Sequence, residues 1–166
     1  LADVLASVGD SYGNVGDYTG AIAANSRALA IHDADPSTSP VALGRTLEAL
    51  GTSYQILGDH AGAIAFLTRA STVYRESLPG TEGRLASVLK QTAFSVGAVG
   101  DSSAAASLIR EAIAFQEQFY GSADPDVAVI GLTVGLIRDS YSETMTALND
   151  QVNILRDELG EEGIDR

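Results

Sequence analysis

The chain repeats itself with a period of 42 residues. The segment Gly-Asp-Tyr-Thr-Gly-Ala-Ile at 16–22 returns as Gly-Asp-His-Ala-Gly-Ala-Ile at 58–64. A second shift by the same offset reaches the Gly-Asp pair at 100–101, and a third reaches the Ser-Glu pair at 142–143. Self-similarity at a fixed period of this size indicates stacked units, each of which buries its apolar face only against its neighbours. The expected units are about 1–40, 41–82, 83–124 and 125–160.

Other positions keep the same register through the chain. Small residues recur in one series, which is Gly9, Gly51, Ala93 and Gly135. A second series starts with two aromatic residues and consists of Tyr12, Tyr54, Val96 and Arg138. Small residues at a fixed interval favour close helix contacts, and the Tyr positions favour packing between paired helices over recognition. The fourth unit departs most from the pattern.

Each unit predicts two helices joined by a tight turn. In the second unit, residues 43–57 place apolar side chains at spacings of three and four, which is one stripe of a helix. The turn Gly permits a backbone conformation that is costly for other residues, and the acidic residue after it favours a helix start. Proline-containing stretches separate the units. The expected helices are 1–14, 18–32, 41–57, 60–77, 83–98, 102–119, 126–140 and 143–159.

Charge and composition argue against several classes of partner. The formal charge is −12, and Lys and Arg form no cluster that could follow a phosphate backbone or an anionic membrane. The chain has no Cys, no apolar run of about 20 residues and no signal-peptide pattern. We therefore expect a soluble chain without nucleic-acid or membrane partners, with a cytoplasmic location as the default. Because it starts at Leu1 inside a helical pattern, we expect a fragment of a longer protein.

These positions resemble the tetratricopeptide repeat, with Leu, Gly and Tyr in the first helix, Gly at the turn and two small residues in the second. The first unit supplies Leu5, Gly9, Tyr12, Gly16, Ala21 and Ala28. The second supplies Leu47, Gly51, Tyr54, Gly58, Ala63 and Ala70. The third keeps Leu89, Gly100, Ala105 and Ala112, while Ala93 and Val96 replace Gly and Tyr. The resemblance covers nearly the whole chain.

The longer period and the loop at 121–128 are similar to the kinesin light chain variety of this repeat, because the standard unit has 34 residues. The chain also resembles the repeats of multidomain bacterial signalling proteins. The resemblance implies an all-α, right-handed solenoid whose first helices line a concave groove. It also implies that the chain binds a protein or peptide, as the sensor or adaptor part of a larger signalling protein.

The resemblance gives the candidate groove residues. They are Asp10, Asn14, Arg45, Glu48, Thr52, Gln55, Lys90, Gln91 and Phe94. The groove face also includes Asp3, Ala6 and Ser7. Some members of the family hold a terminal carboxylate with a Lys/Asn/Arg clamp, and the matching positions here, which include Ala6 and Ala49, do not reproduce it. A chaperone-tail-binding function is therefore disfavoured.

Catalysis and self-association are the alternatives to partner binding. Catalysis has no support, because no nucleophile elbow, metal-protease or phosphate-loop motif occurs, and His32 and His60 have no partner at ligand spacing. We expect no enzyme activity, no metal and no cofactor in these residues. The alternative is a self-associating or filament-forming scaffold, because a solenoid without polar capping helices exposes an apolar end face.

Overall fold

The computed structural model describes residues 1–35 and 37–120, and the regular secondary structure of this part is entirely α-helical. The helices are α1 (Ala2–Asn14), α2 (Tyr18–Ala34), α3 (Pro40–Ile56), α4 (His60–Glu76), α5 (Glu82–Ala98) and α6 (Ser102–Tyr120). Six of the expected helices are thereby confirmed, and the largest difference is that α2 ends at residue 34 rather than 32. The expected helices 126–140 and 143–159, and the fourth unit with them, lie outside the described residues.

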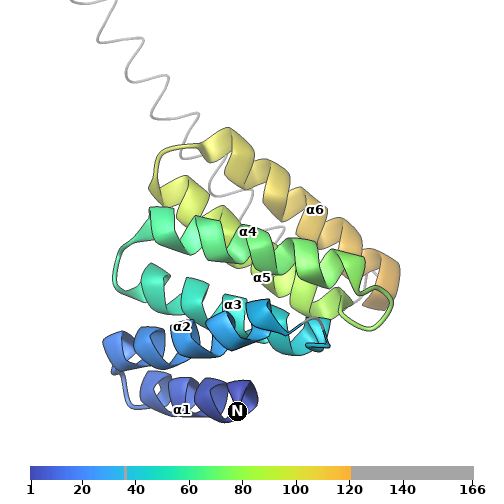
Figure 1. Cartoon of the computed structure of the whole chain (residues 1–166). Helices are drawn as coiled ribbons and strands as arrows, with labels where there is room; N and C mark the ends of the chain where they lie inside the picture. The colour runs from blue at the N-terminus through green and yellow to red at the C-terminus, as the bar shows by residue number, and fades with distance from the viewer. Residues whose placement is uncertain (36, 121–166) are drawn as a thin grey trace, which may run out of the picture.

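The helices form three pairs that stack one on the next (Figure 1). Within the pairs α1 packs on α2, α3 on α4 and α5 on α6. Between the pairs α2 packs on α3 and α4 on α5, while the first helices α1, α3 and α5 also contact one another in sequence. This arrangement is an all-α helical-repeat solenoid with a layer of first helices and a layer of second helices.

The turn inside each pair has the same geometry. Gly16, Gly58 and Gly100 have φ angles of 82°, 83° and 98°, a left-handed conformation that Gly adopts without strain. The carboxylate of the next residue caps the second helix. Asp17 accepts a hydrogen bond from the Gly20 amide at 2.8 Å, and Asp59 and Asp101 accept equivalent bonds from Gly62 and Ala104. The Gly-Asp repeat is therefore a turn followed by a helix cap.

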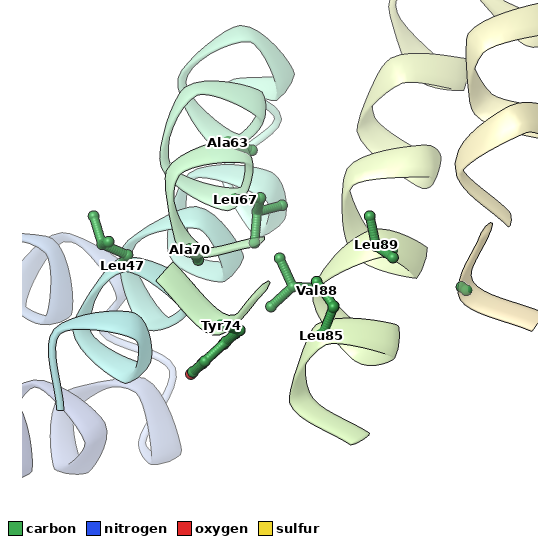
Figure 2. Packing of buried hydrophobic residues seen from close by; sticks show 9 residues of the cluster. Leu47, Ala63, Leu67, Ala70, Tyr74, Leu85, Val88 and Leu89 are labelled. Atoms are coloured by element: carbon green, nitrogen blue, oxygen red, sulfur yellow. The ribbon is translucent and has the colours of Figure 1, made fainter. Parts of the chain in front are cut away.

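The main apolar core lies between α3, α4 and α5 (Figure 2). Its largest fully buried side chains include Leu47 from α3, Leu67 and Tyr74 from α4, and Leu85 from α5. Close helix approach depends on a small residue here, because a Cβ on Gly51 would lie 2.5 Å from Leu67 Cγ. A smaller core between α5 and α6 contains Ala93, Ala105 and Ile109.

The two Tyr residues of the repeat pack within their helix pairs. Tyr54 stacks on Phe66 with 5.3 Å between ring centroids, and its ring edge lies over Gly62. Tyr12 lies over Gly20 in the same way, but it remains 42% exposed. Both positions agree with the packing role expected from the repeat.

None of the helices in residues 1–35 and 37–120 is both long and apolar enough to cross a membrane.

Candidate partner-binding groove

A hollow of about 530 Å³ lies between the first helices of units one and two, and we call it the α1–α3 hollow. Its walls come from α1 and α3, and α2 supplies its floor through Tyr18, Ala21 and Asn25. Five of the nine candidate groove residues line it. They are Asp10, Asn14, Arg45, Glu48 and Thr52. The structure therefore brings together side chains that lie as much as 42 residues apart in the sequence.

The other four candidates, Gln55, Lys90, Gln91 and Phe94, do not line this hollow. Gln55 and Gln91 instead join α3 to α5. The Gln55 side-chain amide donates to the Gln91 backbone carbonyl at 2.9 Å and to Ser95 Oγ at 2.7 Å. The Thr52 hydroxyl donates to Gln91 Oε1 at 2.8 Å. These contacts fix the spacing of two first helices, so the glutamines have a structural task at this interface.

Glu48 is the most connected of the candidates. Its carboxylate accepts a hydrogen bond from the buried Tyr74 hydroxyl at 3.0 Å and lies 3.5 Å from the Arg84 guanidinium. Burial raises the pKa of Tyr74, and the neighbouring Glu48 charge raises it further. The phenol is therefore a neutral donor that ties α4 to α3. Because its side chain is only 20% exposed, Glu48 forms a wall of the hollow rather than a freely moving contact.

The rim of the hollow carries one open ion pair. Arg45 Nη2 lies 3.5 Å from Asp10 Oδ2, and the two side chains are 57% and 46% exposed. An exposed pair of this kind contributes about 0–1 kcal/mol, so a partner can exchange it for its own charges at little cost. Two of the candidate residues are thus available for recognition without loss of the fold.

Phe94 has a different environment. Its side chain is 65% exposed on α5, and its ring meets His60 edge-on with 5.9 Å between centroids. Lys90, on the same helix, is partly buried.

No group of three or more His, Cys, Asp or Glu within the described ranges is arranged to hold a metal ion.

Asn25 is a site residue that the sequence interpretation missed. Its side chain is 1% exposed, it lines the α1–α3 hollow, and it also lines a smaller hollow of about 140 Å³ beside Asp3 and Ser7. In the described part of the chain, its Oδ1 has no hydrogen-bond partner. The 42-residue register could have found it, because that register matches Asn25 to the core residue Leu67. A polar residue at a core position is the signal.

A comparison with protein-family models gives no match, and neither does a comparison with curated proteins. Solved structures do match. BtubC (BKLC) from P. vanneervenii superposes with a TM-score of 0.70 at 19% identity, over 97% of this chain and 64% of that one. A Podosopora anserina kinesin light chain protein with nearly identical TPR-like repeats gives 0.69 at 16% identity, over 94% of this chain and 75% of that one.

Two further structures agree. The apo form of RapI gives a TM-score of 0.74 at 14% identity, over 96% of this chain and 57% of that one. The N-terminal domain of the stress-induced protein STI-1 from C. elegans gives 0.63 at 16% identity, over 82% of this chain and 94% of that one. The chain thus spans less than two thirds of BtubC and of RapI. At these identities the likeness establishes the fold, which is that of the tetratricopeptide-type helical-repeat solenoids, as the sequence resemblance predicted.

Proposed function

We propose that this chain is a non-catalytic scaffold that binds a partner protein or peptide in the α1–α3 hollow, as the sensor or adaptor part of a larger signalling protein. The observation that carries the proposal is the hollow itself, which is lined by five residues that the repeat pattern had assigned to the groove. A fold alone does not determine function, so the site has to support the assignment.

The chemistry of the hollow suits a peptide segment. Its lining combines exposed polar groups such as Asn14 with two oppositely charged pairs, Asp10–Arg45 and Glu48–Arg84. The exposed Ile56 adds apolar surface at one end. Mixed polar, charged and apolar contacts of this kind can hold a backbone and several side chains together.

Peptide display tests this proposal. Peptides selected on the unaltered chain would be measured by calorimetry against a groove variant with Asn14→Ala, Arg45→Ala and Thr52→Ala. The matched control carries three alanines on the exposed second-helix surface, at Ser26, Arg27 and Thr68. Because each lost contact is worth about 1 kcal/mol, we expect the groove variant to bind at least about tenfold more weakly. Equal losses in both variants, or none in either, would contradict the proposal.

One observation favours self-association as a second candidate function. Val4 and Val8 on α1 and Leu1 just before it are exposed, whereas the residues that match them in unit three are buried against α4. Those matching residues are Leu85, Val88 and Thr92. A second copy could cover the α1 face as α4 covers α5. Sedimentation at rising concentration should then show dimers that the pair Val4→Asp and Val8→Asp abolishes, and a monomer throughout would exclude this candidate.

A further inference from the structure

Two successive interfaces between first helices can be compared residue by residue, because the 42-residue register aligns them. Between α3 and α5, the Gln55 side-chain amide donates to the Gln91 backbone carbonyl at 2.9 Å and to Ser95 Oγ at 2.7 Å, and Gln91 Oε1 accepts from the Thr52 hydroxyl at 2.8 Å. This glutamine pair joins the two helices across their interface. The α3–α5 interface therefore meets its own hydrogen-bonding needs without a ligand.

Between α1 and α3, both glutamines are missing. The register puts Gly13 in the place of Gln55 and Ala49 in the place of Gln91. No described atom of a neighbouring element lies within 4 Å of the position that a Cβ on Gly13 would take. Gly13 and Ala49 both line the α1–α3 hollow. The hollow thus lies at the register positions that two glutamines occupy one unit later.

The floor of the hollow changes from apolar to polar at the same step. Leu67 is buried in the core of unit two, and Asn25 occupies the matching position in unit one. The Asn25 amide lies against Gly9, where a Cβ would come within 2.3 Å of Nδ2. A buried amide oxygen without a donor destabilises the fold, and Leu at this position would avoid that cost. This residue is therefore better suited to a hydrogen-bonding ligand than to packing.

We propose that the α1–α3 hollow receives the carboxamide side chain of a glutamine from the bound partner, and that Asn25 is the residue that selects it. The inference rests on the proposed partner-binding function and specifies its chemistry. The glutamine amide donates to Asn25 Oδ1, and its carbonyl accepts from the Asn25 amide. Rotation about the soft terminal torsion of Asn25 turns either end of its amide toward the hollow that it lines.

Other side chains match the site less well. A carboxylate cannot donate to Asn25 Oδ1. A Lys ammonium donates but cannot accept from the Asn25 amide. An apolar side chain leaves the buried oxygen without a partner. A carboxamide offers a donor and an acceptor without charge, as the glutamine pair does between α3 and α5.

An amide NMR titration with N-acetyl-glutamine methylamide tests the inference on the intact chain. For a probe of roughly 14 heavy atoms, binding should saturate with a dissociation constant of about 1 mM. We expect the largest shifts at the Asn25 side-chain amide and at the Gly9 and Gly13 backbone amides. The control probes are the corresponding glycine and leucine compounds, which carry the same backbone amides. Both should give shifts at least about tenfold weaker than the glutamine probe.

Two variants separate the site from the fold. Asn25→Leu installs the unit-two residue and should lose the glutamine response at least about tenfold while melting no lower than the unaltered chain. Gly13→Gln with Ala49→Gln rebuilds the glutamine pair and should block the hollow with Asn25 still present. Ser26→Ala, on the exposed face of α2 next to Asn25, is the matched control and should bind as the unaltered chain does.

Several outcomes would overturn the inference: no saturable response, equal responses to the glycine or leucine probe, or full binding by Asn25→Leu. These outcomes are distinct from a failure of the proposed function. If display-selected peptides still depend on Asn14, Arg45 and Thr52 but carry no glutamine requirement, only the glutamine inference fails. If they do not depend on the groove residues, the proposed function fails as well.

Discussion

At the scale of single residues, the spacing of paired helices depends on which side chain faces a glycine. In unit two Gly51 faces Leu67, and in unit one Gly9 faces Asn25. The sequence predicted both glycines as helix contacts, because small residues that recur at a fixed period indicate close contacts whatever side chain faces them. It did not predict Asn25 as a site residue, because the repeat signature records the small residues and not the side chains that face them.

Gly51→Ala should destabilise the chain, because the added Cβ would meet Leu67 at 2.5 Å. Overpacking of this kind typically costs about 1–3 kcal/mol. Urea denaturation followed by circular dichroism measures the change. Gly13→Ala is the matched control, since the space beside it is open, and its helix propensity should add about 0.5–1 kcal/mol of stability. Equal stabilities for the two variants would show that Gly51 is not a close contact.

The candidate groove residues lie in different places in the structure. Asp10, Asn14 and Arg45 line the α1–α3 hollow. Gln55 and Gln91 bond across α3 and α5, and no single-helix pattern contains that information because the two residues belong to different units. A hydrogen bond between two units can be recognised only once the two helices are placed together.

At the scale of helices, the boundaries were predictable because their signals are local. Turn glycines and capping carboxylates act within a few residues, and α3 begins at Pro40, a residue that suits the first turn of a helix. Asp17 and Asp101 accept hydrogen bonds from backbone amides and from neighbouring hydroxyls. Both bonds lower the pKa of each carboxyl, and the bond from the backbone amide has the larger effect.

These caps predict a loss of stability in acid. A carboxyl whose pKa is lower in the folded state contributes stability above its unfolded pKa of about 3.9, and that contribution disappears as pH falls through the folded pKa. The pair Asp17→Asn and Asp101→Asn keeps a side-chain cap but cannot titrate. Its melting temperature should therefore fall less than that of the unaltered chain between about pH 5 and about pH 3. Parallel slopes would contradict this account of the caps.

At the scale of the whole molecule, stability comes from stacking, since each helix pair buries its stripe only against a neighbour. Leu1 and Leu85, which the repeat register matches, show how a stacked and an unstacked face differ in exposure. Leu85 is fully buried against the α4 side of the core, and Leu1 is 84% exposed. The sequence predicted the stack from its period, but the exposure of each face depends on what lies beside it, and the repeat pattern assigns both leucines the same environment.

Leu85→Ala should lower the free energy of unfolding by about 2–5 kcal/mol, because it removes buried volume from the α4–α5 interface. Leu1→Ala makes the same chemical change at the matching position and should alter stability by less than about 0.5 kcal/mol. Urea denaturation of both variants provides the comparison. Similar costs at the two positions would mean that the α1 face is covered in solution, which is the result that self-association predicts.

A crystal structure of the chain with a display-selected peptide shows whether a partner binds along the first-helix layer. We expect the peptide to lie in the α1–α3 hollow, in contact with Asn14 and Arg45 and with a carboxamide side chain directed at Asn25. A peptide bound instead to the outer surface of α2 and α4, with the hollow unoccupied, would show that the first-helix layer is not the binding surface.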